Sequence, residues 1–109
     1  MGGQDTGPAP YEYVAAGLGA CTSITLRMYA DRKKWPVDQI KVKVLHHKRP
    51  KQEAGDGPLD VFTRQIEILG GLDATQLARM IEIANKCPVH RTLEAGAHVV
   101  TKRVENSES

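Results

Sequence analysis

Two stretches of the chain alternate between apolar and polar residues, which is typical of a strand with one buried face. The first runs from Ile40 to His47, and the second from Val61 to Leu69, where Arg64 interrupts an otherwise apolar face. The segment between them, Lys48 to Leu59, is charged and rich in glycine and proline. We therefore expect the two strands to form a hairpin.

The stretch from Pro10 to Lys33 has the pattern of a long helix. Its first residue is a proline, which suits the first turn, and basic residues near its end match the negative end of the helix dipole. From Val14 to Cys21 no polar side chain occurs on any side. A helix that is apolar all round is expected to be buried all round, with Gly17 and Gly19 closely approached by a neighbour.

Two shorter helices and a last strand should follow the hairpin. Asp73 begins an amphipathic helix that continues to Lys86, and Gln76 completes a capping-box pattern with Asp73. A fresh start at Cys87-Pro88, with cysteine near the N-cap and proline at the first position, then predicts a helix over Val89 to Glu94 that ends at Gly96. Val99 to Val104 is expected to form a final strand.

The predicted order αββααβ indicates a single α+β domain over residues 1–109, with helices packed against an antiparallel sheet. Met1 to Ala9 is expected to be a loop, and Glu105 to Ser109 a polar tail. Three strands are too few to cover the long apolar helix. We therefore expect a partner chain to cover the rest.

The composition excludes several classes of protein. The chain is 40% hydrophobic and 26% charged, and its net charge of +2 is too small to indicate a nucleic-acid partner. The apolar runs reach about half of the ~20 residues that a membrane span needs, and no secretory signal pattern is present. With only 2 cysteines, we expect a cytoplasmic protein whose thiols serve redox or catalytic chemistry.

The two cysteines are the main candidates for chemistry. At a helix N-terminus, free N–H groups and the dipole would lower the pKa of Cys87. Cys21 lies in mid-helix, so it is either a small core residue or a thiol that depends on tertiary neighbours. Cys87 and His90 have a ligand-like spacing, but Cys21 has no adjacent ligand, so we expect no metal.

Helical spacing places an apolar wall beside Cys21. The residues on its face of the helix include Val14, Leu18, Thr25 and Met28. This wall suits a hydrophobic substrate better than a sugar or a nucleotide. Glu12, nine residues before the cysteine, falls on the opposite side of a straight helix.

Two long motifs, GGQDTGPAPYEYVAAGLGACTSITLRMYADRKKWP and NKCPVHRTLEAG, closely resemble the cysteine motifs of the OsmC/Ohr family. The resemblance covers residues 2 to 104 and is greatest to the small OsmC-like proteins of bacteria and archaea. It implies an intertwined homodimer. In this fold each subunit's sheet wraps around two central helices, and the active sites lie at the dimer interface.

The resemblance also implies a chemistry. The best-known members of the family reduce organic hydroperoxides with a cysteine pair. Carried over by motif, Cys21 would be the peroxidatic thiol and Cys87 the resolving thiol, the reverse of what the helix dipole alone suggests. An external dithiol, such as a lipoyl group, or small thiols would reduce the resulting disulfide, and no cofactor is implied.

Relatives usually place an arginine beside the reactive thiol, on strands that precede the glycine-rich loop with which this chain begins. Here Arg27, Arg64 and Arg91 are the candidates to stabilise the thiolate, and Glu12 is the acidic residue that the motif supplies. The leading prediction is a cytoplasmic thiol peroxidase that acts on organic hydroperoxides or hydrogen peroxide in oxidative stress defence. The alternatives are a dimeric stress or binding protein with little peroxidase activity, and a thiol redox sensor or carrier.

Overall fold

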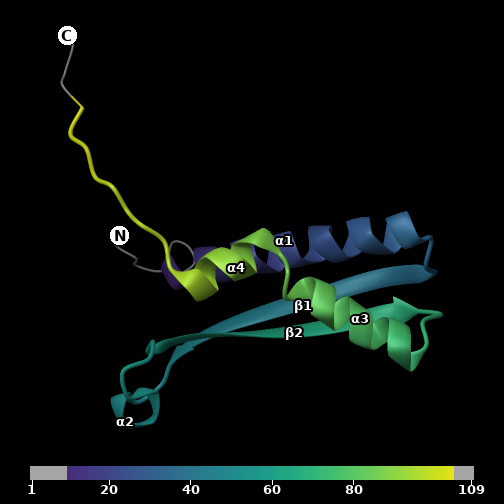
Figure 1. The fold of residues 1–109 in the computed structure, drawn as a ribbon, viewed down its shortest axis with the longest axis horizontal. Coiled ribbons are helices and arrows are strands. Elements are labelled where there is room, and N and C mark those ends of the chain that lie inside the picture. The colour runs from purple at the N-terminus through teal and green to yellow at the C-terminus, as the bar shows by residue number, and fades with distance from the viewer. Residues whose placement is uncertain (1–9, 105–109) are drawn as a thin grey trace.

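The computed structural model describes residues 10–104. Its elements are α1 (Pro10–Lys33), β1 (Val37–Lys48), α2 (Lys51–Ala54), β2 (Asp60–Gly70), α3 (Ala74–Ala84) and α4 (Pro88–Ala95). The strands form a two-stranded antiparallel sheet, and α1 packs against the sheet and against α3 and α4 (Figure 1). The α+β class is confirmed, whereas the loop expected at Met1 to Ala9 and the tail expected at Glu105 to Ser109 lie outside the described residues.

The hairpin has the expected faces. Val42 pairs with Ile66, and Val44 pairs with Arg64, so Arg64 lies on the half-buried face of the sheet. His46 is also half-buried, whereas His47 is exposed. The loop between the strands contains the short helix α2, which the sequence pattern did not predict.

The core forms where the second half of α1 meets α3 and the sheet. Six buried residues make up its centre: Leu26, Tyr29, Ala30, Met80, Ile83 and Ala84. Trp35 packs edge-on against Tyr29 with ring centroids 5.5 Å apart, just after α1 ends. Apolar residues from the half-buried face of the sheet complete this cluster, as expected for one layer of helices on one sheet.

The expectation that α1 is buried on every side is wrong for the chain by itself. Its buried residues are Ala15, Leu18, Thr22, Leu26, Tyr29 and Ala30, which repeat with helical spacing along one side. On other sides Tyr13, Ile24 and Met28 are 60–64% exposed. Gly19 faces Val44 in ordinary contact, but nothing lies within 4 Å of a Cβ at Gly17. One sheet and two short helices cover only part of a helix this long.

The strand expected over Val99 to Val104 is not formed. Residues 96–104 have no regular structure and extend away from the body of the molecule (Figure 1). Val99, Val100 and Val104 are 63–87% exposed. The sequence has β-branched residues at the right positions, but a strand also needs a neighbouring strand to accept its hydrogen bonds. Within residues 10–104, neither β1 nor β2 pairs with this segment.

The two shorter helices begin as the sequence predicts. The Asp73 side chain accepts a hydrogen bond from the backbone N–H of Gln76 at 2.8 Å, and the Gln76 side chain accepts one from Asp73 N at 3.0 Å. Cys87 is the N-cap of α4, and Pro88 is its first residue. Both predicted helix starts are therefore confirmed, and α4 extends one residue beyond Glu94.

Candidate active site

The structure brings the two cysteines together. Cys21 lies in the middle of α1, and Cys87 lies at the start of α4, which packs against α1. The Cys21 thiol is within hydrogen-bonding reach of Cys87, and both thiols are free. Cys87 is 0% exposed, whereas Cys21 is partly exposed. The two thiols therefore differ in their access to solvent although they lie close together.

The surroundings of Cys87 favour its thiolate. Burial raises the pKa of the Cys87 thiol, but hydrogen bonds lower it by more, and the largest of these effects comes from the Cys21 thiol. Backbone N–H groups of His90 and Val89, and then the Thr22 hydroxyl, act in the same direction. The pKa of Cys87 is thus lowered, as its place at a helix N-terminus predicts.

Thr22 connects this thiol to the rest of the site. The residue is fully buried, and its hydroxyl donates a hydrogen bond to Leu18 O at 2.7 Å. The same oxygen lies 4.0 Å from the Sγ of Cys87. A buried hydroxyl needs hydrogen-bond partners, and here one of them is the carbonyl one helical turn earlier.

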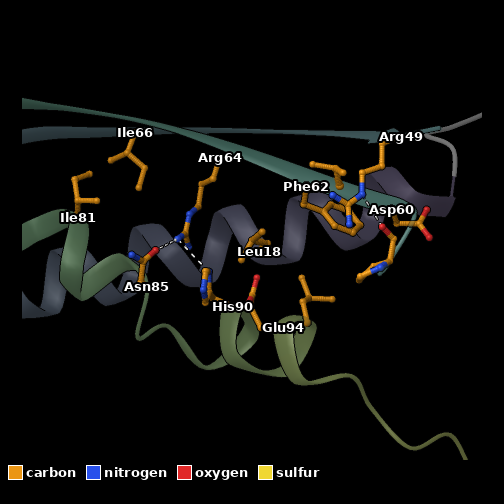
Figure 2. Close-up of a pocket in the computed structure, with 13 residues that line it drawn as sticks. Leu18, Arg49, Asp60, Phe62, Arg64, Ile66, Ile81, Asn85, His90 and Glu94 are labelled. Carbon is orange, nitrogen blue, oxygen red and sulfur yellow. Dashed lines mark hydrogen bonds between the residues drawn. The ribbon is translucent and has the colours of Figure 1, made fainter. Parts of the chain in front are cut away.

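Arg64 reaches into the site from β2. Its guanidinium donates to Thr22 Oγ1 at 2.9 Å and Ala84 O at 3.1 Å. It also donates to Asn85 Oδ1 at 2.9 Å and contacts His90 Nδ1 at 3.1 Å (Figure 2). Arg64 therefore links the sheet to α1 and to both sides of the turn that carries Cys87.

The other two candidate arginines lie elsewhere. Arg27 donates to Val37 O at 3.1 Å and forms an ion pair with Asp31 at 3.6 Å, beside the start of β1. Arg91 is exposed on α4. Of the three arginines singled out in the sequence, Arg64 is the one whose hydrogen bonds reach the residues around the thiol pair.

Sequence reasoning missed the partners of Arg64. Thr22 and Asn85 were not named as site residues, and His90 was considered only as a metal ligand. Thr22 and His90 each give a signal in the sequence, because Thr22 is the first polar side chain after the apolar stretch that ends at Cys21, and His90 lies about one helical turn after Cys87. An arginine on the buried face of a strand also requires several acceptors close by.

A cavity of about 840 Å³ opens beside this cluster. Figure 2 shows Arg64, Asn85 and His90 together along it, with Arg49 and Asp60 farther along. Its apolar lining is contributed by Leu18, Val61, Phe62, Ile66, Ile81 and Leu93. The wall therefore comes from β2, α3 and α4 as well as from α1.

Of the four residues expected to form the pocket wall, only Leu18 lines this cavity. Val14 is 38% exposed and Met28 is 62% exposed, while Thr25 is partly buried. None of these three is among the lining residues. The physical reason is that the residues on one face of a helix point over a wide range of directions, and of these residues only Leu18 points toward the cavity.

Glu12 lies beside a second cavity, of about 580 Å³. It shares that cavity with Ala16 and Ala20 of α1 and with Val44 and His46 of β1. Glu12 does not line the cavity beside Arg64. The structure thus places this carboxylate apart from the larger cavity, in agreement with its helical position relative to Cys21.

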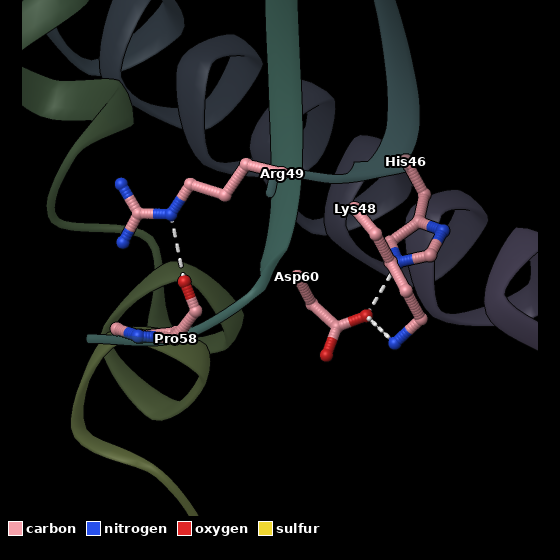
Figure 3. A network of polar contacts seen from close by, with 5 residues as sticks. All are labelled: His46, Lys48, Arg49, Pro58 and Asp60. Atoms are coloured by element: carbon pink, nitrogen blue, oxygen red, sulfur yellow. Dashed lines mark hydrogen bonds and ion pairs between the residues drawn. The ribbon is translucent and has the colours of Figure 1, made fainter. Parts of the chain in front are cut away.

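A separate polar cluster closes the ends of the two strands (Figure 3). The Asp60 carboxylate contacts His46 Nε2 at 2.9 Å and Lys48 Nζ at 2.8 Å. Hydrogen bonds to Lys48 and His46 lower the pKa of Asp60, and the bond to Asp60 raises the pKa of Lys48. Tyr11 stacks on the His46 ring at 4.4 Å, which fixes the N-terminal end of α1 to the hairpin.

Neither metal ligands nor a membrane span are found in the described part of the chain. Within residues 10–104 no group of three or more histidine, cysteine, aspartate or glutamate side chains is arranged to bind a metal ion. None of the helices in that range is long and apolar enough to cross a membrane.

The OsmC-like protein family model matches residues 3–102. This chain belongs to the OsmC-like family. The crystal structure of an OsmC-like protein from Mycoplasma pneumoniae superposes with a TM-score of 0.68 at 22% identity. The match covers 85% of this chain and 68% of that one.

A second OsmC-like structure, described as a hydroperoxide resistance protein from Jannaschia sp. CCS1, superposes with a TM-score of 0.57 at 23% identity. That match covers 100% of this chain and 74% of the other. No curated protein matches the sequence. The structural likenesses establish the OsmC-like fold, and the family predicted from the two cysteine motifs is confirmed.

Proposed function

We propose that this OsmC-like protein is a cytoplasmic thiol peroxidase that reduces organic hydroperoxides. The observation that carries the proposal is the packing of α4 on α1, which brings the Cys21 thiol within hydrogen-bonding reach of Cys87. The similar Jannaschia protein is described as a hydroperoxide resistance protein, which agrees with this chemistry. Neither cysteine lines the neighbouring cavity, but Leu18, one turn before Cys21, does, and the apolar part of that lining favours an organic peroxide over hydrogen peroxide.

Access and acidity suggest different roles for the two thiols. Cys21 is partly exposed, so a peroxide can approach it, whereas Cys87 is 0% exposed. A resolving thiol needs to be a thiolate in contact with the oxidised sulfur, and it needs no contact with solvent. Cys87, with its lowered pKa and its contact to Cys21, has both properties.

The proposed reaction has two steps. The Cys87 thiolate takes the Cys21 proton, the Cys21 thiolate attacks a peroxide oxygen, and the O–O bond breaks. The alkoxide takes the proton now held by Cys87 and leaves as an alcohol, so Cys87 is again a thiolate and Cys21 carries a sulfenic acid. The Cys87 thiolate attacks that sulfur, a disulfide forms, and the hydroxide that leaves takes a proton from solvent and becomes water. A dithiol, such as a lipoyl group, or two small thiols reduce the disulfide and become oxidised themselves.

Peroxide consumption with dithiol reductant tests this proposal. With dithiol present, wild type should turn over cumene hydroperoxide repeatedly and Cys21→Ser should fall to the background rate. With dithiol absent, wild type and Cys87→Ser should each consume one peroxide per chain, but only wild type should end as a disulfide. A dimedone adduct on Cys21 in the Cys87→Ser variant would identify the sulfenic acid. Turnover that survives Cys21→Ser would overturn the proposal.

Two alternatives predict other outcomes of the same assay. A redox sensor would form the Cys21–Cys87 disulfide once per chain, without sustained turnover. A stress or binding protein with little peroxidase activity would show neither turnover nor peroxide-dependent loss of free thiols. The closeness of the two thiols favours the sensor over the purely binding role, because a disulfide needs two cysteines that lie near each other.

We also propose that the protein is a homodimer. The support is the apolar surface of α1 that the chain leaves exposed at Tyr13, Ile24 and Met28. Apolar side chains exposed to this degree along one helix suit a second protein surface. The open space around Gly17 would allow the backbone of a partner to approach closely.

A further inference from the structure

We propose that Arg64 is a positioning residue that favours the thiolate form of Cys87. It acts through the Thr22 hydroxyl and through the turn between α3 and α4. This inference rests on the proposed thiol chemistry and names a residue that supports the thiolate used in it. Within residues 10–104 the guanidinium forms no hydrogen bond with either sulfur. Its influence therefore passes through the groups it binds.

The first connection is the Thr22 hydroxyl. Arg64 Nη1 donates to Oγ1 at 2.9 Å, so the oxygen acts as an acceptor and its single hydrogen is directed to another group. Two acceptors are in reach, Leu18 O at 2.7 Å and the Cys87 sulfur at 4.0 Å. A bond from a cation polarises the hydroxyl and makes it a stronger donor. When Cys87 is ionised, the hydrogen can turn from the carbonyl to the sulfur.

The second connection is the end of α3. The last carbonyl groups of a helix carry partial negative charge, which would oppose a thiolate nearby. Ala84 O and Asn85 Oδ1 lie at this end, two to three residues before Cys87, and Arg64 donates to both. The guanidinium thus offsets the negative end of α3 at the point where Cys87 needs a positive environment.

The third connection is the first turn of α4. Because the guanidinium can only donate, His90 Nδ1 must accept, and the ring hydrogen then lies on Nε2. This bond holds His90 in place, and the backbone N–H groups of His90 and Val89 are those that act on the Cys87 sulfur. Arg64 therefore fixes both the residues before Cys87 and the residues after it.

All four acceptors of Arg64 are neutral groups. Among the ion pairs of residues 10–104, none joins this guanidinium to a carboxylate. A partly buried cation without a carboxylate partner keeps its charge available to other groups nearby. Here the group that gains from a positive environment is the Cys87 thiolate.

The ionisable groups around Cys87 come from three elements. Cys21 faces it from α1, Arg64 acts from β2, and His90 lies on α4. Lys86 and Arg91, on either side of Cys87 in sequence, are exposed. A titration of the Cys87 thiol must therefore be made with Cys21 replaced and the other groups unchanged.

The test is a pH titration of thiolate absorbance at 240 nm in the Cys21→Ser background, where Cys87 is the single thiol. Thr22→Val exchanges a hydroxyl for a methyl group of similar size, and both Thr22→Val and Arg64→Met should raise the titration midpoint by about one pH unit. Thr22→Ser keeps the hydroxyl and should restore the wild-type midpoint. Arg64→Lys keeps the positive charge but loses the planar guanidinium that donates to several groups at once, so it should give an intermediate titration midpoint.

Arg79→Met is the matched control. Arg79 is also a partly buried arginine, but it bonds to Tyr29 and Glu82, away from the thiols, and its loss should leave the midpoint unchanged. Circular dichroism at each pH confirms that every variant is folded. An unchanged midpoint in Arg64→Met would overturn the proposal, and equal midpoints for Thr22→Val and Thr22→Ser would overturn the connection through Thr22. The titration uses no peroxide, so its outcome is separate from that of the peroxidase assay.

Discussion

At the scale of single residues, the site is asymmetric. Cys21 and Cys87 lie within hydrogen-bonding reach, yet one is partly exposed and the other is fully buried at a helix N-terminus. Two neighbouring thiols with unequal access to solvent are suited to sequential roles rather than to equivalent ones. The Thr22 hydroxyl lies next to the Cys87 sulfur, and Arg64 donates a hydrogen bond to that hydroxyl.

Asp60 should make the stability of the protein depend on pH. Its folded-state pKa is lowered from the ordinary value of 3.8, chiefly by the hydrogen bonds to Lys48 and His46. A lowered folded-state pKa means that the stabilisation is present above 3.8 and is lost as pH falls through the folded-state value. Asp60→Asn should therefore have a lower Tm than wild type at pH 7.

Thermal melts between pH 2 and 7 measure this effect. The Tm difference between wild type and Asp60→Asn should shrink toward zero at the acid end of the range. The exposed carboxylate Asp38 supplies the control, because Asp38→Asn should leave the Tm nearly unchanged at neutral pH. A constant difference across the whole range would contradict the assignment of the effect to Asp60.

At the scale of elements, the hairpin and the long helix are joined by a tight connection. Gly70, the last residue of β2, has φ +150° and pairs with Val37, the first residue of β1. A Cβ at Gly70 would overlap the carbonyl oxygen of Pro36 and lie 2.9 Å from the Cα of Val37. The close approach of two backbones requires glycine at this position.

Gly70→Ala should lower the free energy of unfolding by about 3 kcal/mol, because the backbone must move or accept strain. Gly71→Ala is the matched control. A Cβ there would meet only the Pro36 side chain, at 3.5 Å, and stability should change by less than about 0.5 kcal/mol. Urea unfolding of the two variants measures the difference, and similar values for both would show that the connection tolerates a side chain.

The sequence predicted those elements whose signals are local. The alternation in both strands, the capping box at Asp73 and the N-cap at Cys87 each depend on neighbouring residues, and each is present. The strand at Val99 to Val104 failed because strand formation depends on a distant partner. The cluster around Arg64 joins residues 20 to 42 positions away in sequence, so local pattern could show that Arg64 is unusual but not what it binds.

At the scale of the whole molecule, the chain leaves much apolar surface uncovered. Exposed apolar residues occur on α1 and along residues 96–104, and the principal extents are 57 × 45 × 30 Å. A domain of this size is expected to bury roughly two-thirds of its unfolded surface, and an elongated single chain makes that difficult. A second copy of the chain would supply the missing cover.

Sedimentation equilibrium should therefore give a mass near twice the 12.0 kDa of one chain. The double variant Ile24→Lys and Met28→Lys places charge in the proposed interface and should shift the mass toward one chain. Lys34→Glu changes charge at an exposed position beyond the end of α1 and should leave the mass unchanged. A wild-type mass of one chain at all concentrations would refute the dimer.

The two ends of α1 have a mechanical consequence for the thiol pair. Near one end Tyr11 stacks on His46 of β1, and near the other Tyr29 packs against Trp35, just before β1. Aromatic contacts therefore hold α1 in place near both of its ends. Cys21 lies between these supports. By contrast α4 contains no buried residue. The Arg64–His90 hydrogen bond holds the first turn of α4, so we expect the part of α4 beyond His90, rather than α1, to move most when the disulfide forms.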